Sequence, residues 1–138
     1  MKKLIAAIFA AVLMTAGLVS FTSAPATAAC PYTGCVRTDT EVSGPNVLNR
    51  GTKPRLTLTV TTNGNAKPRG WVRLVIRRNA GGFSTVRNVY YGGETKVVIG
   101  PELNKLGTYT VAARFTPADG SAFKPSFDRK NIRVKRPS

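Results

Sequence analysis

The side chains best able to do chemistry in this 138-residue chain are basic: it has 21 Lys and Arg, 6 Asp and Glu, and no His. Without His, the usual imidazole base, His-dependent nucleophile triads and His metal ligands are excluded. The acids are too dispersed to indicate a glycosidase pair or a calcium loop, at Asp39, Glu41, Glu94, Glu102, Asp119 and Asp128. No base that could activate a Ser or Thr is evident from spacing. We therefore expect a protein that binds rather than catalyses, with no metal or cofactor.

Seven large side chains fall on alternating positions of three short segments, between residues expected in a core. They are Trp71, Arg73, Arg77, Arg114, Arg129, Arg133 and Lys135. Alternate residues of a strand face opposite sides of a sheet, so these side chains share one outer face if the three segments are neighbours. Such a face attracts anions, Arg can bind phosphate or sulfate through two hydrogen bonds, and Trp71 can stack on a sugar or base. The alternative is a solvated strand face whose charge serves solubility.

The elements that must position these residues are short strands. Apolar and polar residues alternate from 55 to 61 and from 71 to 78, and Gly-rich breaks separate the later segments. The pattern predicts about seven strands, at 38–43, 55–61, 71–78, 84–91, 94–99, 108–115 and 128–136. Seven short strands in about 100 residues indicate an all-β antiparallel sandwich, with a barrel as the alternative. Tyr90 and Tyr91 are adjacent, so we expect only one of them to be exposed.

The first 29 residues have the three parts of a secretory signal peptide. Lys2 and Lys3 precede an apolar run, and an A-x-A pattern ends at Ala28. A transmembrane anchor is the weaker alternative because the run is only marginally long. Acylation of Cys30 is a further alternative, although Thr27 stands where a lipoprotein signal prefers Leu. We expect cleavage, which lowers the formal net charge from +15 to +13, and no stable membrane anchor.

The two cysteines lie close together at the expected mature terminus. Cys30 and Cys35 bracket a Pro-Tyr-Thr-Gly turn, and two Cys in an exported chain most simply form a disulfide. A redox or metal pair is the alternative, but two thiolates are only half of a zinc site. The expected organisation is a signal peptide at 1–29, a disulfide-stapled segment at 30–37 and one sandwich domain at 38–138.

Three segments resemble an immunoglobulin-like sandwich of the bacterial Ig-like domain family. Residues 103–113 (LNKLGTYTVAA) look like the tyrosine-corner segment, in which a Tyr at the start of the sixth strand hydrogen-bonds back across the corner. Residues 70–74 (GWVRL) resemble the opening of the third strand, and 131–134 (NIRV) the last strand. The resemblance implies an extracellular module used as a spacer or for adhesion. It also implies that the third, sixth and seventh strands are neighbours in one sheet. Leu58 and Val111 stand about where antibody domains have their inter-sheet cysteines, so apolar packing must hold the sheets together.

We predict a secreted, extracellular binding or adhesion module. Association with the cell wall is one form of this prediction. Its basic face would bind teichoic acid, acidic polysaccharide, extracellular DNA or a host glycosaminoglycan. One alternative is a structural spacer or subunit that pairs with another surface protein through a sheet edge. Another is a secreted inhibitor or effector that presents its loops to a protein target.

Overall fold

The computed structural model describes residues 36–138. The predicted signal peptide at 1–29, the possible acylation of Cys30 and the predicted Cys30–Cys35 disulfide lie outside the described residues. Within 36–138, no helix has the length and apolar character needed to cross a membrane.

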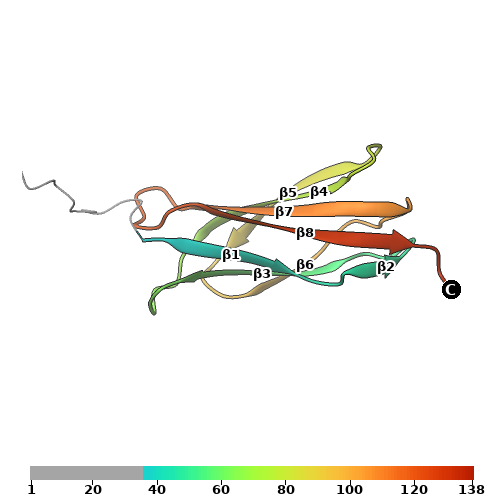
Figure 1. Ribbon diagram of the computed structural model, residues 1–138. Coiled ribbons are helices and arrows are strands. Elements are labelled where there is room, and N and C mark those ends of the chain that lie inside the picture. The colour runs from blue at the N-terminus through green and yellow to red at the C-terminus, as the bar shows by residue number, and fades with distance from the viewer. Residues whose placement is uncertain (1–35) are drawn as a thin grey trace, which may run out of the picture.

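Eight strands form two sheets that lie face to face (Figure 1). One sheet has three strands in the order β1-β3-β6, and the other has five in the order β2-β8-β7-β4-β5. The strands are β1 (Thr38–Ser43), β2 (Val47–Asn49), β3 (Arg55–Thr62), β4 (Gly70–Arg78), β5 (Ser84–Tyr91), β6 (Lys96–Ile99), β7 (Gly107–Pro117) and β8 (Ser126–Lys135). The all-β sandwich prediction is confirmed.

The count of seven strands missed β2, which pairs in parallel with β8. Its backbone is tied to β8 at both ends, where Arg133 N–H donates to the Asn46 carbonyl and Arg50 N–H to the Lys135 carbonyl, each at 2.8 Å. Three residues are too few to show a period in the sequence, so β2 depends on this pairing. The other strand pairs are antiparallel.

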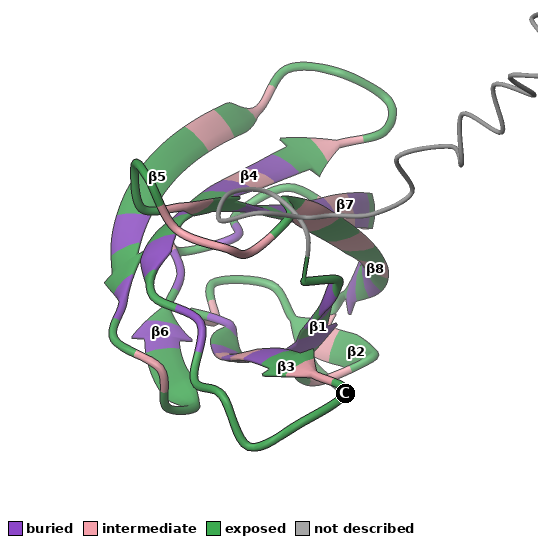
Figure 2. Ribbon diagram, turned by 90° about the vertical axis from the view of Figure 1, so that its left-hand side faces the viewer, coloured by how far each residue is buried: buried purple, intermediate pink, exposed green. Residues whose placement is uncertain are grey.

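The inner faces of both sheets form one apolar core. Buried and exposed residues alternate along the central strands, visible as bands in Figure 2, which shows the sandwich from another side. Leu58 and Val111, at the positions of the antibody-domain cysteines, are both fully buried. The buried Tyr91 hydroxyl also joins the two sheets, because it accepts a hydrogen bond from the Val60 N–H of β3 at 3.0 Å. Apolar packing holds the sheets together, as expected for a sandwich without the inter-sheet disulfide, and hydrogen bonds such as this one and those between β1 and β8 add to it.

Tyr109 forms the predicted tyrosine corner. Its ring is completely buried at the start of β7 and packs edge-on against Phe83, with centroids 5.6 Å apart. Its hydroxyl donates to the Lys105 carbonyl at 2.9 Å. Leaving out the short β2, the adjacent strands β4, β7 and β8 are the third, sixth and seventh of the chain. The fold is immunoglobulin-like.

Candidate functional site: a basic sheet face

All seven predicted side chains lie on the outer face of the five-stranded sheet. In the register, Arg73 of β4 lies opposite Arg114 of β7, and Ala112, which shares that face, lies opposite Arg129 of β8. The inner residues of these strands, such as Leu74, Val111 and Ile132, are buried, so the alternate residues point outward. We call this surface the basic face, defined by exposed Arg73, Arg77, Arg114, Arg129, Arg133 and Lys135. Trp71 lies on the same surface, at the start of β4.

The basic face carries no opposing charge. Among the described residues, no outward position of these five strands holds Asp or Glu. The one acid in the five strands is Asp128, whose carboxylate points inward and accepts a 2.9 Å hydrogen bond from Val42 N–H of β1. In residues 36–138 the one ion pair joins Lys67 and Glu94 at 3.0 Å, away from this face. The positive potential of the face is therefore not neutralised by neighbouring side chains.

Three of the arginines form a contiguous group. Arg73 and Arg114 are direct cross-strand partners. Arg129 lies on the neighbouring strand β8, two residues beyond the residue that faces Arg114. Residues in this diagonal position are typically about 7–8 Å apart. Like charges at such spacing repel one another, so an anion that bridges them would relieve an unfavourable interaction.

Aromatic side chains gather at one end of the basic face. Trp71 and Tyr90 are cross-strand partners whose rings meet edge to face, with centroids 5.5 Å apart. Phe127 lies opposite Arg114, and the Arg129 guanidinium carbon is 5.1 Å from the centre of the Phe127 ring. We call Trp71, Tyr90 and Phe127 the aromatic end. They remain 54%, 46% and 50% exposed, so much of their surface is open to a ligand.

Backbone geometry and a hollow shape this end. Gly70 lets β4 approach β7 closely, because a Cβ there would lie 2.2 Å from the Thr116 carbonyl oxygen. A shallow hollow of about 190 Å³ opens beside Arg114 and Phe127. A flat group with an attached anion therefore has room next to both an aromatic ring and a cation.

Sequence reasoning missed Phe127 and did not connect Tyr90 with Trp71. Phe127 was missed because the last strand was expected to begin at Asp128, whereas β8 begins at Ser126. Extending the alternation backward from Arg129 would have placed it outward. The expectation that only one of the adjacent tyrosines is exposed is confirmed, since Tyr91 is buried.

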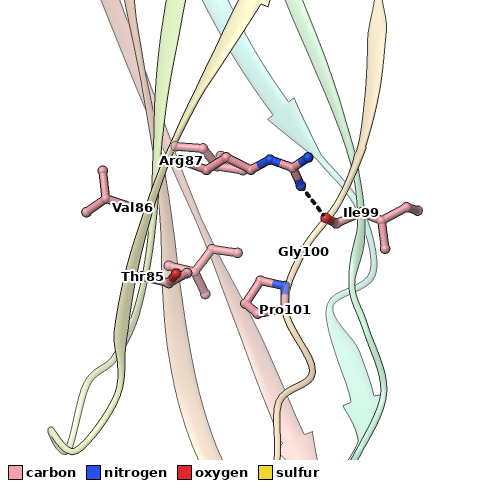
Figure 3. A pocket seen from close by; sticks show the side chains of 8 residues that line it. Thr85, Val86, Arg87, Ile99, Gly100 and Pro101 are labelled. Atoms are coloured by element: carbon pink, nitrogen blue, oxygen red, sulfur yellow. Dashed lines mark hydrogen bonds between the residues drawn. The ribbon is translucent and has the colours of Figure 1, made fainter.

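A separate hollow of about 280 Å³ lies between β5 and β6, which are edge strands of the two sheets. Figure 3 shows Arg87 reaching across it, where the guanidinium donates to the Ile99 carbonyl at 3.0 Å. Leu74 and Ile76 form part of its lining, with Pro101 at its side. Arg87 closes an edge of the sandwich here and does not belong to the basic face.

The pKa of the exposed Glu94 carboxyl is lowered by its hydrogen bond to Lys67 and by the charge of that ammonium group. Within the described part of the chain, no three His, Cys, Asp or Glu residues come together as a metal site would require. The notable chemistry of the described surface is the basic face itself.

No family model and no curated protein matches the sequence. Among solved structures, the chain is similar to the CARDB domain of a Pyrococcus furiosus protein in complex with di-metal ions, with 18% identity and a TM-score of 0.48, over 75% of this chain and 96% of that one. It is also similar to part of a β-glucosidase from Listeria innocua in complex with glucose, with 14% identity and a TM-score of 0.43. That match covers 72% of this chain and 16% of the enzyme. Both are similarities of backbone shape, so a ligand must be inferred from this chain's own surface.

Proposed function

We propose that this protein is a non-catalytic binding module whose basic face holds an extended anionic polymer. The observation that carries the proposal is the set of six exposed cations on one sheet face whose outward positions include no carboxylate. A clustered basic surface concentrates anions near it and speeds their capture. Arginine contributes further because its planar guanidinium can bind a phosphate or sulfate through two hydrogen bonds.

The extent of the face favours a polymer over a small anion. Arg129 and Lys135 both lie on the outer face of β8, six residues apart, which corresponds to about 20 Å along the strand at the usual rise per residue. Arg73 and Arg77 lie four residues apart on the outer face of β4. A single phosphate can reach one or two of these groups, whereas a chain of repeated anions can contact most of them at once.

The proposed setting is outside the cell, where the predicted signal peptide would deliver the domain. Teichoic acid, acidic polysaccharide and extracellular DNA are polymers of suitable charge there. A wall-associated adhesion module is the role that this combination supports.

The test compares two double charge reversals of equal size on opposite sheets. Arg73→Glu with Arg133→Glu alters the basic face, and Lys53→Glu with Arg55→Glu alters two exposed cations of the other sheet's side, Arg55 at the first residue of β3 and Lys53 just before it. Lys67 is a poorer control because it already pairs with Glu94. At equal ionic strength, the first variant should bind inorganic polyphosphate at least about tenfold more weakly than wild type, and the second should lose much less. Equal losses would reduce the effect to net charge and overturn the proposal, as would an absence of saturable binding by the wild type.

A second candidate function, pairing with another protein through a sheet edge, is supported by β6. In the described residues this short strand pairs on one side with β3, and its outward Val97 and Ile99 are about half exposed. No described strand pairs with its other edge, where the Arg87 guanidinium holds the Ile99 carbonyl, and an edge with apolar side chains can accept another strand if that hydrogen bond is released. Val97→Lys with Ile99→Lys should abolish such pairing and leave polyphosphate binding intact, which sedimentation velocity and the binding assay would separate.

A further inference from the structure

We infer that the aromatic end of the basic face binds the unpaired bases of a single-stranded nucleic acid. This inference rests on the proposed function and assigns it a ligand class. Its evidence is the juxtaposition of three half-exposed rings with Arg73 and Arg114, in two adjacent cross-strand rows of one sheet face.

The two cross-strand rows place rings beside cations. One row contains Tyr90 and Trp71 side by side on β5 and β4. The next runs from Arg73 through Arg114 to Phe127. Rows on one face repeat every second residue, about 7 Å along the strands. Each ring thus stands within one row of a guanidinium, which is the arrangement needed to receive a base and its own phosphate together.

Exposed rings distinguish between anionic polymers that charge alone would treat alike. Polyphosphate and teichoic-type chains have no flat aromatic group, so the three rings would add nothing to their binding. In a duplex the bases already stack on one another and show only their edges in the grooves. A single strand exposes the faces of its bases, and stacking on aromatic side chains beside a basic track is the general mode of such binding.

The neighbouring polar residues are compatible with this ligand. Asn88 lies opposite Arg73 on the same face, with its amide exposed beside the rings. Amide and guanidinium groups can hydrogen-bond the edge of a base that has left its stack. No carboxylate stands among the outward residues of these strands to repel the phosphates.

Trp71 is the only Trp of the chain, so its fluorescence reports on the aromatic end directly. The probe is an oligomer of about twelve thymidines, within the usual site size of small single-strand binders. The matched control ligand is an abasic oligomer with the same number of phosphates. The oligothymidine should quench Trp71 fluorescence and bind at least about fivefold more tightly than the abasic oligomer, since each stacked base adds roughly that factor or more.

Variants separate the rings from general surface effects. Trp71→Ala, read by fluorescence anisotropy of labelled oligomer, and Phe127→Ala should each weaken oligothymidine binding about fivefold or more and leave abasic binding unchanged. Val86→Ala is the control, because Val86 is an exposed apolar residue on the same face, away from the rings. It should change neither affinity. All three side chains are about half exposed, and thermal unfolding of each variant verifies that the fold is retained.

Two results would overturn the inference while leaving the proposed function standing. One is equal affinity for the two oligomers, without quenching and with sensitivity only to the charge reversals. The other is quenching and ring-dependent binding by heparin equal to that by oligothymidine, which would make the aromatic end a sugar platform. Failure of wild type to bind either oligomer or polyphosphate would remove the proposed function as well.

Discussion

The outer faces of the two sheets differ sharply although their inner faces are built in the same way. The three-stranded sheet presents what we call the threonine face: Thr57, Thr59 and Thr61, flanked by Asp39 and Glu41 of β1 and by Val97 and Ile99 of β6, with Arg55 at one end. The five-stranded sheet presents the basic face and its aromatic end. Charge is thus distributed unevenly: carboxylates lie beside the threonines of one sheet, and none lies among the outward arginines of the other.

This difference separates what the fold requires from what it leaves free. Both sheets bury every second residue, as in Leu56 and Leu58 of β3 and Val72 and Leu74 of β4. Core packing constrains those positions and leaves the alternate ones open. A surface of exposed rings and unpaired cations is not needed for folding, so its accumulation on one face is the best indication of function.

The largest expected effect comes from reversing the contiguous arginines. Arg73→Glu, Arg114→Glu and Arg129→Glu together should weaken polyphosphate binding about a hundredfold or more at low salt, because several phosphate contacts are lost at once. Isothermal titration at fixed ionic strength measures this.

Returning part of the lost charge to the other sheet provides the control for that triple variant, which lowers the net charge by six. Thr57→Lys and Thr61→Lys, added to it, return two of these six charges on the threonine face and should recover little of the lost affinity. Recovery of about a third of the lost binding free energy would show that the position of the charge is immaterial.

The next largest effect is a loss of stability that should not change how the basic face binds. Tyr91→Phe removes the hydroxyl that accepts from Val60 N–H between the sheets and leaves that buried donor without its side-chain partner. The free energy of unfolding should fall by about 1–3 kcal/mol. Urea denaturation measures the loss, and polyphosphate affinity of the folded variant should match wild type. A large loss of affinity would mean that the basic face depends on the spacing of the two sheets.

A smaller effect on the free energy of unfolding is expected from the like-charged pair on the basic face. Arg73 and Arg114 are direct cross-strand partners of like charge, an arrangement that typically costs about 0.2–1 kcal/mol. Arg114→Thr should therefore raise the free energy of unfolding at low salt by a similar amount while weakening polymer binding. Added salt should reduce that gain, since it screens the repulsion in wild type. A lower stability at every salt concentration would contradict this account of the pair.

The smallest effect is expected outside both faces, at Lys67 and Glu94. The ammonium group lowers the pKa of the Glu94 carboxyl, so any stabilisation is present above the unfolded-state pKa and is lost as the pH falls through the folded value. Because both side chains are exposed, Glu94→Gln should shift the melting temperature at pH 7 within the scatter of the measurement. A clear drop would show that this pair does more than contact at the surface.

The sequence was sufficient for the central strands and for the placement of six cations, because period-two alternation there coincides with a complete apolar core. Val72, Leu74 and Ile76 determine the inward face of β4, and Arg73 and Arg77 follow from them. β2 could not be found in this way, since Val47 and its two neighbours become a strand only by pairing with β8. The contact between Trp71 and Tyr90 likewise depends on the register of β4 and β5, which the spacing within one strand does not determine. Phe127 was lost by an error of two residues in the start of β8.

The most direct test of a positional basic face is the salt dependence of polyphosphate binding in two single neutral variants. Each cation that contacts a phosphate contributes roughly 0.7–0.9 to the slope of log K against log salt concentration. Arg73→Gln should lower the magnitude of the slope by about that amount, whereas Arg55→Gln on the threonine face should leave it unchanged. An equal decrease in both variants, or no decrease in either, would contradict the assignment of the binding surface to the five-stranded sheet.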